Sequence, residues 1–282
     1  MEFSQPGAEV YVPDGAPVDA ALARTTHLGI SAHQDDLEIM ALDGILAGFG
    51  SADAWFTAVV VTNGAGSARD DLYADYTDEQ MRAVRRVEQK KAAHVGEYAA
   101  AVFLDLPSSA IKDATRPDAV ADIRQVLLAA TPRIVYIHNL ADKHPTHVAT
   151  AAAALRAIRS LPASQRPEKL YGCEVWRDLD WLVDEDKVVF RYDKHENIAA
   201  ALLGVYDSQI VGGKRYDLAT QGRRKAHATY HESHAVDAST SINFAMDLTP
   251  LIRDDQLDVV EYVTAHIDRL RESVAAQLRP YA

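Results

Sequence analysis

The sequence predicts an α/β protein with a Rossmann-like, mostly parallel sheet and helices on both of its faces. Two observations support this prediction. Short apolar runs typical of buried strands alternate with longer stretches that have helical periodicity. Polar clusters also stand directly after two of the apolar runs, at the edge of a parallel sheet where ligands usually bind.

The first 160 residues show this alternation most clearly. Residues 1–22 mix glycine, proline and charge without clear periodicity, and we interpret them as an N-terminal arm before a single domain at 23–282. Thr77 to Gln80 resembles a capping box, and Pro145 suits the first turn of a helix. The expected strands are 26–32, 55–62, 101–106 and 133–138, and the expected helices are 37–49, 78–98, 117–130 and 145–160.

The pattern changes after Pro162 to mixed strands and helices, which we expect to complete the same domain. Strand-like runs lie at 170–176 and 188–192, on either side of an acidic turn. The remaining expectations are a helix at 196–206, a mobile loop at 211–214 and a closing helix at 258–278.

Composition narrows the classes of partner. The formal net charge of −12 argues against nucleic acid or an anionic membrane as the main partner, because both require a basic face. No apolar stretch is long enough to span a bilayer, and no secretory signal begins the sequence. Cys173 is the only cysteine, which fits a reducing compartment. We therefore expect a cytoplasmic protein that acts on a small molecule, and the composition is compatible with a homo-oligomer.

The two polar clusters have the spacing of metal ligands. Where a chain enters a helix, residues i and i+3 share a face, which groups His33 with Asp36 and His144 with His147. Asp35 then points away from its neighbours, toward the cleft. A solvated helix start explains either cluster alone, but both stand at predicted strand ends. Two imidazoles and one carboxylate suit catalytic Zn²⁺, with Fe²⁺ or Co²⁺ as alternatives.

The residues around both clusters resemble the motifs of a known family. Residues 32–38 read Ala-His-Gln-Asp-Asp-Leu-Glu, where the PIG-L or LmbE-like N-acetylglucosaminyl deacetylases have Ala-His-Pro-Asp-Asp-x-Glu. Residues 144–147 read His-Pro-Thr-His, where the family has His-Pro-Asp-His. The chain is similar to the family over about residues 25–235, with shorter matches at Thr62-Asn63-Gly64, Arg85-x-x-Glu88, 104–107, Ser208-Gln209 and Tyr230-x-Glu232.

The resemblance implies an activity and a role for each matched residue. The activity is zinc-dependent hydrolysis of the N-acetyl group of an N-acetylglucosamine-type sugar or its conjugate, with one ion per chain. His33, Asp36 and His147 would bind the metal. Asp35 would be the general base, and His144, as imidazolium, would stabilise the oxyanion. Arg85 would hold sugar hydroxyls.

Some residues depart from the family pattern and are expected near the substrate. Gln34 replaces a proline, and Tyr206 stands where the family commonly has a histidine; we count both, with Asn63, as substrate contacts. Thr146 replaces an aspartate that orients the neighbouring imidazole, and Asp142 is the carboxylate that could take its place. Glu38 is interpreted as a structural residue of the helix start.

Several alternatives stay open at this point. The chain could hydrolyse another small amide, or it could be a non-catalytic Rossmann-like module that binds a sugar or nucleotide through residues 63–66. His231 and His234 could form a second metal site, although an exposed segment is the simpler reading. His138 is interpreted as packing near the site. Aromatic residues that either stack on a sugar or pack in the core are Trp176, Trp181 and Tyr192.

Overall fold

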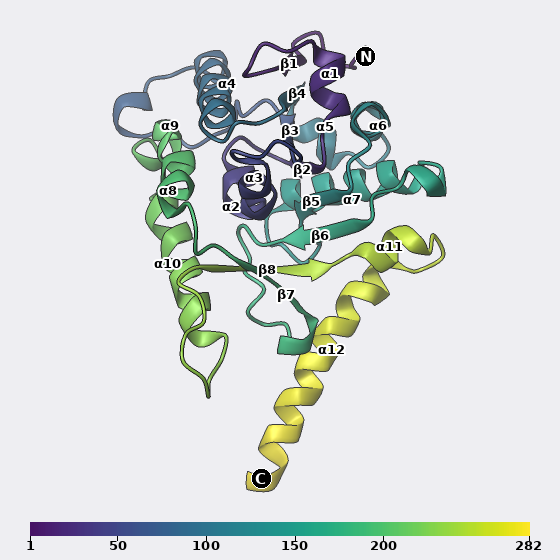
Figure 1. Ribbon diagram of the computed structural model, residues 1–282, viewed down its shortest axis with the longest axis vertical. Helices are drawn as coiled ribbons and strands as arrows, with labels where there is room; N and C mark the ends of the chain where they lie inside the picture. The colour runs from purple at the N-terminus through teal and green to yellow at the C-terminus, as the bar shows by residue number, and fades with distance from the viewer.

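The computed structural model describes residues 1–282 and contains one eight-stranded sheet (Figure 1). The strand order is β1-β4-β3-β2-β5-β6-β8-β7. The five central strands, from β4 to β6, are parallel, whereas β1, β7 and β8 pair antiparallel. The strands are β1 (Glu9–Tyr11), β2 (His27–Ser31), β3 (Phe56–Thr62), β4 (Ala100–Leu106), β5 (Ile134–His138), β6 (Lys169–Cys173), β7 (Lys187–Arg191) and β8 (Ile242–Asp247).

Twelve α-helices connect or cover the strands: α1 (Val18–Ala23), α2 (Asp36–Met40), α3 (Leu42–Gly48), α4 (Asp78–Val95), α5 (Ser108–Lys112), α6 (Asp118–Ala130), α7 (Pro145–Arg159), α8 (Glu196–Gly204), α9 (Asp207–Ile210), α10 (Tyr216–Tyr230), α11 (Thr249–Arg253) and α12 (Val259–Leu278). α12 extends away from the body, with the C-terminus at its far end (Figure 1). No helix has the length and apolar character needed to cross a membrane.

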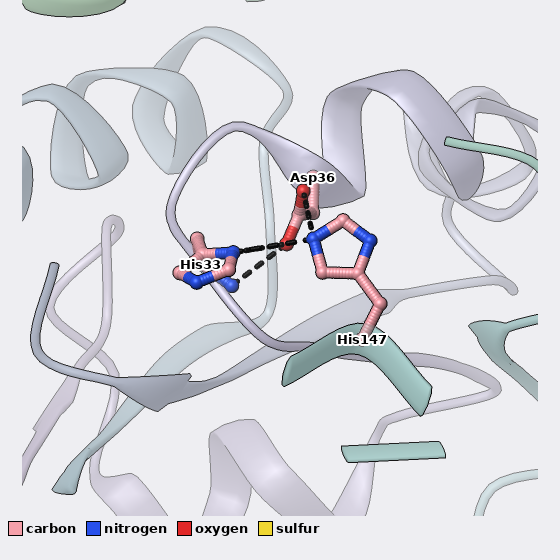
Figure 2. A group of neighbouring side chains, drawn as sticks. All are labelled: His33, Asp36 and His147. Carbon is pink, nitrogen blue, oxygen red and sulfur yellow. Dashed lines mark hydrogen bonds and ion pairs between the residues drawn. The ribbon is translucent and has the colours of Figure 1, made fainter. Parts of the chain in front are cut away.

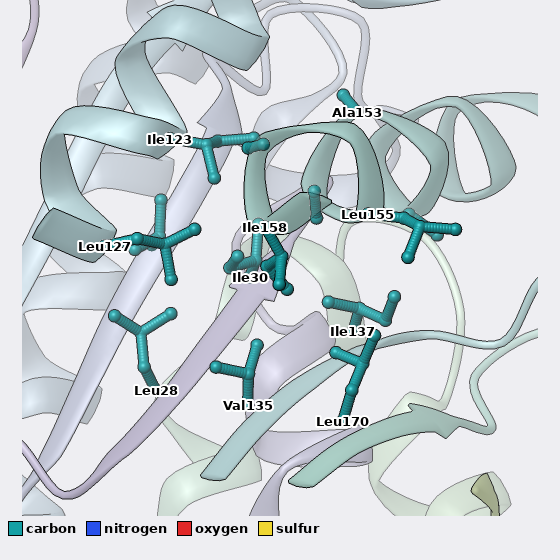
Figure 3. Close-up of a cluster of buried hydrophobic side chains, with 14 of the residues drawn as sticks. Leu28, Ile30, Ile123, Leu127, Val135, Ile137, Ala153, Leu155, Ile158 and Leu170 are labelled. Carbon is teal, nitrogen blue, oxygen red and sulfur yellow. The ribbon is translucent and has the colours of Figure 1, made fainter. Parts of the chain in front are cut away.

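Two hydrophobic cores, one on each face of the sheet, confirm the predicted fold class. Side chains alternate along β3, so Val59 and Val61 enter one core while Ala58 and Val60 enter the other. The first core is covered mainly by α1, α6, α7 and α11, and Figure 3 shows part of it between α6, α7 and the strands. The second is covered by α2, α3, α4 and α8. Burial on both faces explains why the central strands are continuous apolar runs.

The core in Figure 3 gives a test of the packing. Ile123 on α6 is fully buried in it. We expect Ile123→Ala to lower the free energy of unfolding by about 2–5 kcal/mol, because it leaves a cavity as well as removing apolar surface. Ile123→Val removes one methylene and should cost about 0.5–1.5 kcal/mol. Equilibrium denaturation with urea measures both. If both variants were as stable as the wild type, Ile123 could not be packed in this core as described.

The elements match most of the predicted ones, but several differ, and the short helices α5, α9 and α11 were not predicted. The six predicted strands are present, but β1 and β8 were not predicted. Residues 1–22 contain β1 and most of α1, so the expected arm is part of the sheet, with Val10 paired to Val102. The helix expected at 37–49 is divided at Ala41, which leaves helical geometry with φ −111°. The expected loop at 211–214 is followed by an unpredicted helix, α10. The mobility of that loop stays a prediction.

The strand order determines where a ligand can bind. Starting from β2, the chain adds β3 and β4 on one side and then returns to add β5 and β6 on the other. The sheet therefore has its topological switch point between β2 and β5, and ligands of such sheets bind outside the carboxyl ends of the strands at that point. Both polar clusters of the sequence follow those two strands.

Candidate metal centre

The turn after β2 brings two side chains of the first cluster together. The His33 backbone N–H donates to Asp36 Oδ2 at 2.7 Å, which closes the turn into α2. Asp35 lies between them with φ 86°, a left-handed conformation that aspartate and asparagine tolerate better than most residues. This turn places His33 Nδ1 3.3 Å from Asp36 Oδ2, as the i,i+3 spacing predicts.

The second cluster begins α7. Pro145 occupies the first turn of this helix, as expected, and His147 follows within the same turn, fully buried. His147 Nδ1 lies 3.3 Å from Asp142 Oδ2. With its proton on Nδ1, His147 donates a hydrogen bond to Asp142, and the lone pair on Nε2 is free to bind a metal. Metal-binding histidines usually have this arrangement.

The two clusters meet in one group of three donor atoms. Figure 2 shows His33, Asp36 and His147 turned toward one another. His147 Nε2 lies 3.2 Å from His33 Nδ1 and 3.4 Å from Asp36 Oδ1. Ligands of tetrahedral zinc at 2.0–2.1 Å from the metal are about 3.3 Å apart. The donor types and their spacing therefore fit a zinc-sized divalent cation.

The protonation of the group also suits a cation. Burial lowers the pKa of His147 to about 4, against the opposing effect of Asp36, so the imidazole is neutral near pH 7. Burial alone would raise the pKa of Asp36, but the neighbouring His147 and His138 outweigh it and hold the pKa well below its usual value. A neutral imidazole and an ionised carboxylate are the forms that bind metals.

Asp35 lies beside the three donors but outside their group. It lines the cleft, and its Oδ1 is 3.5 Å from Arg85 Nη2. Burial raises its pKa well above the usual value, with Arg85 opposing and Asp36 adding to the shift. A carboxylate whose pKa is raised toward neutrality is a better proton acceptor for catalysis.

His144 lines the cleft next to the donors, with its ring centre 5.2 Å from that of His33. Burial and the charge of His33 lower its pKa, which disfavours the imidazolium expected from the sequence. As a neutral ring, His144 still offers an N–H donor. Asp142 accepts from the His144 backbone N–H at 3.0 Å, and its carboxylate contacts the ring of the other histidine of this cluster, His147.

His138, at the end of β5, joins the two metal-binding segments. Its ring stacks on His147 with centroids 3.9 Å apart, and its Nε2 accepts the Ala32 N–H at 2.9 Å. His138, Asp142 and His147 form a second group of metal-ligand type. The hydrogen bonds that His138 and Asp142 already make favour a supporting role for this group. The sequence predicts His138 as packing near the site, and the stacking and the hydrogen bond confirm this.

Other predicted substrate contacts lie away from the cleft wall. Gln34 is buried and donates to Thr62 O at 3.2 Å. The Asn63 side chain accepts from Ala65 N–H in a tight turn, and the next α-helix begins only at Asp78, so the loop is not a phosphate cradle of the helix-terminal type. Tyr206 is 1% exposed and belongs to the second core. Thr146 does line the cleft.

The other polar residues that the sequence singles out have structural explanations. Ser208 is buried, donates to Glu88 Oε2 at 2.7 Å and does not line the cleft, so it is not a candidate nucleophile. Glu38 is buried and accepts from Gln89 and Tyr98, in keeping with a structural role. His231 and His234 belong to neither group of metal-ligand type.

The cleft has a volume of about 420 Å³ and contains residues that the sequence did not indicate as functional. Besides the predicted site residues, Arg85 among them, it is lined by Ser108, Lys112, Gln209, Lys214 and Tyr216. Trp176 is there too, stacked on His144 with centroids 6.0 Å apart. Arg85 is 2% exposed, and its Nε and Nη1 have no protein partner, so it retains free donors for a ligand.

The fold and this group of donors define a Rossmann-like α/β protein with a candidate divalent-metal centre at its switch point. Residues 28–158 match the family model described as PIG-L, GlcNAc-PI de-N-acetylase. The chain therefore carries a PIG-L family domain, which confirms the resemblance seen in its motifs. It is also 27% identical over 153 residues to "Uncharacterized deacetylase YaiS" of Escherichia coli K12, covering 54% of this chain and 77% of that protein.

Solved structures share the fold at low sequence identity. The 4-carboxy-2-hydroxymuconate hydratase GalB from Pseudomonas putida KT2440 has a TM-score of 0.63 at 15% identity, covering 79% of this chain and 96% of its own. The N,N'-diacetylchitobiose deacetylase from Pyrococcus horikoshii has a TM-score of 0.61 at 13% identity, covering 82% and 86%. A hydratase and a deacetylase thus share this architecture, so the reaction has to be argued from the site and the family.

Proposed function

We propose that the chain is a zinc-dependent N-deacetylase that releases acetate from an N-acetylglucosamine-type sugar or its conjugate. The family match supports hydrolysis of an N-acetyl amide, and so does the similarity to the Escherichia coli protein that is named a deacetylase. The observation that carries the proposal is the convergence of His33, Asp36 and His147, whose ring nitrogens lie 3.2 Å apart and 3.3–3.4 Å from the two Asp36 oxygens, with the Asp35 carboxylate beside the group but not part of it. This arrangement provides a place for a cation and a separate base.

The donor set suits Zn²⁺ best, with Fe²⁺ and Co²⁺ as alternatives. A cation held by His33, Asp36 and His147 would supply Lewis-acid polarisation of the amide carbonyl and of the attacking water. Asp142 would keep His147 in the tautomer that binds, and His138 would hold its ring in place by stacking.

Asp35 would accept a proton from the water as the water oxygen adds to the carbonyl carbon. It would then return this proton to the nitrogen as the C–N bond breaks, which yields acetate and a free amine. His144, as a neutral N–H donor, would hydrogen-bond the oxygen that becomes negative; one such donor typically contributes about 3–4 kcal/mol. The free N–H groups of Arg85 would bind sugar hydroxyls.

Removal of the metal tests the proposal directly. Incubation with a strong chelator should abolish amine release from an N-acetylglucosaminide, and adding Zn²⁺ after the chelator is removed should restore it. Readdition of Fe²⁺ or Co²⁺ in parallel identifies the best metal. Amine and acetate should appear in equal amounts. Amine release that persists when bound metal is undetectable would refute the metal-dependent mechanism. If the protein hydrolysed only simple amides, it would instead be a hydrolase of another small amide.

Three predictions from the sequence are not tested by the structure: that the chain is cytoplasmic, that it forms a homo-oligomer, and that it is organised as a single domain.

A further inference from the structure

The C-terminal helix α12 leaves the body of the protein well before it ends. Its start packs against the first core, where Val263 is buried, and Arg269 makes its last ion pair with another element, to Asp186. From residue 270 to the C-terminus, no hydrogen bond or ion pair joins this segment to the chain before α12. Figure 1 shows the second half of the helix clear of the body. Isolated helices shorter than about 12–15 residues are marginal in water, so this half would gain stability from a partner.

An apolar stripe runs along α12 at the spacing of a heptad repeat. Val260, Ile267 and Val274 recur every seven residues, and Val263 and Leu270 lie three residues after the first two of them. This is the a and d pattern of a helix that packs lengthwise against another helix, with β-branched residues at a. Inside the chain only the start of the stripe is covered. The three residues of the seven-residue repeat are 69%, 48% and 47% exposed, in chain order.

The stripe continues to the end of the chain. Gln277 occupies the next d position, but Leu278 beside it is 59% exposed, and Tyr281, seven residues after Val274, is 89% exposed. Single exposed apolar side chains are normal, whereas a contiguous row of them marks an interaction surface. The row extends over about six helical turns, so the surface that covers it has to be long and narrow, as another helix is.

The charges of α12 and its N-cap indicate the direction in which a second copy of the helix would pack. Acidic residues dominate the first half and basic residues the second half. In chain order they are Asp258, Glu261 and Asp268, followed by Arg269, Arg271, Glu272 and Arg279. A parallel copy would place like charges at the same level, whereas an antiparallel copy places the acidic half beside the basic half. Antiparallel packing also opposes the two helix dipoles favourably. The helix is therefore complementary to a reversed copy of itself.

A membrane surface fits this helix less well than a second copy does. Amphipathic helices that lie in a bilayer interface are rich in Lys and Arg on the polar face and carry Trp, Phe or Leu on the other. Residues 258–282 contain four acidic and three basic residues, no Trp or Phe, and more valine than leucine. This composition provides no attraction to anionic lipid.

We propose that α12 is a dimerisation surface, on which α12 of a second copy of this chain packs in the antiparallel direction. The same stripe on both copies then meets itself across a twofold axis near Leu270. Ile267 of each copy lies beside Val274 of the other, and Val260 lies beside Tyr281. None of the residues that line the metal cleft belongs to α12, so the inference does not depend on the proposed reaction.

The first test measures the mass of the full chain by sedimentation velocity at increasing protein concentration. The wild type should convert from monomer to dimer. Val274→Glu places a carboxylate of each copy in the interface and should raise the dissociation constant more than about 100-fold. The matched control is Ala276→Glu, because Ala276 is exposed on the same half of the helix and lies about 200° further round it. This variant should dimerise like the wild type.

Both substitutions leave the body of the protein untouched, and glutamate is a good helix former, so both variants should fold. Circular dichroism checks this. A wild type that stays monomeric at every concentration would overturn the proposal, and so would a dimer that Val274→Glu leaves intact. Vesicles of phosphatidylcholine and phosphatidylglycerol provide a further arm. If the wild type stayed monomeric and bound them through the stripe, so that Val274→Glu released it, the occupant would be a membrane and the proposal wrong.

Cysteine cross-linking tests the direction of the pair. Leu270→Cys lies at the twofold axis and should form a disulfide-linked dimer under mild oxidation. Leu278→Cys should not, because antiparallel packing places the two copies of residue 278 about 20 Å apart. The native Cys173 is buried and 1% exposed, so it should not contribute. Linkage at both positions would indicate a parallel pair and contradict the antiparallel arrangement.

Discussion

Replacing His147 by alanine is expected to remove the metal and, with it, the catalytic activity. His147 is one of the three predicted ligands and is fully buried, with its two ring nitrogens facing Asp36 and Asp142. Loss of an outer partner of a metal ligand already costs about 10–100-fold in metal affinity. Loss of the ligand itself should therefore cost more than about 100-fold, measured by competition with a chromophoric chelator.

His266→Ala is a suitable control for this experiment. His266 is also buried, at 5% exposed, but lies on α12, where its Nδ1 contacts Tyr262 O at 2.9 Å. Its removal should leave metal content and turnover at the wild-type level. If His147→Ala retained a full equivalent of metal and its activity, the assignment of the centre would be wrong. Circular dichroism shows whether a loss of metal reflects unfolding.

The second large effect is expected from Asp35→Asn. Asparagine has the shape of aspartate and tolerates the left-handed conformation at φ 86°, so the turn between His33 and Asp36 should persist. Metal content should stay at the wild-type level, because Asp35 is outside the donor group. The amide cannot accept the proton of the attacking water, and kcat should fall by ~10²–10⁴-fold.

Asp43→Asn serves as the comparison for Asp35→Asn. Asp43 is a partly buried carboxylate on α3 that accepts from the Tyr136 hydroxyl at 2.6 Å and does not line the cleft. Steady-state kinetics and metal analysis of both variants distinguish a base from a ligand. If Asp35→Asn lost its metal, Asp35 would be a ligand; if it kept full kcat, another group would have to accept the proton.

The sequence could predict the central sheet because its strands are buried on both faces. Such strands must be apolar throughout, and they stand out as continuous runs such as residues 56–62. The same reasoning fails for α10, whose buried side chains include Thr220, Arg224 and His227. Arg224 donates to the backbone oxygens of Glu38 and Ile39 at the end of α2, so polar contacts hold this helix and leave no apolar periodicity to detect.

The metal ligands were predictable because local helix geometry and sheet topology determine them together. The i,i+3 spacing pairs His33 with Asp36, and the switch point brings His147 to them. The cleft wall formed by Lys214 and Tyr216 could not be predicted, because Lys214 lies in the expected loop and Tyr216 begins α10, which has no apolar periodicity. The sequence indicates Asp142 as a carboxylate that can orient an imidazole, but the turn of α7 determines that this ring is His147.

The pairing of β2 with β5 has a consequence for how the chain acquires its ion. Ile30 lies opposite Ile137 in the register, and neighbouring strands are about 4.8 Å apart, so the segments that carry the donors leave the sheet side by side. The conformational entropy of gathering these donors is lost when the sheet forms and not when the ion arrives. In a zinc finger the ion organises the polypeptide. Here the polypeptide is organised first, so an apoprotein should keep its architecture and be ready to take up metal.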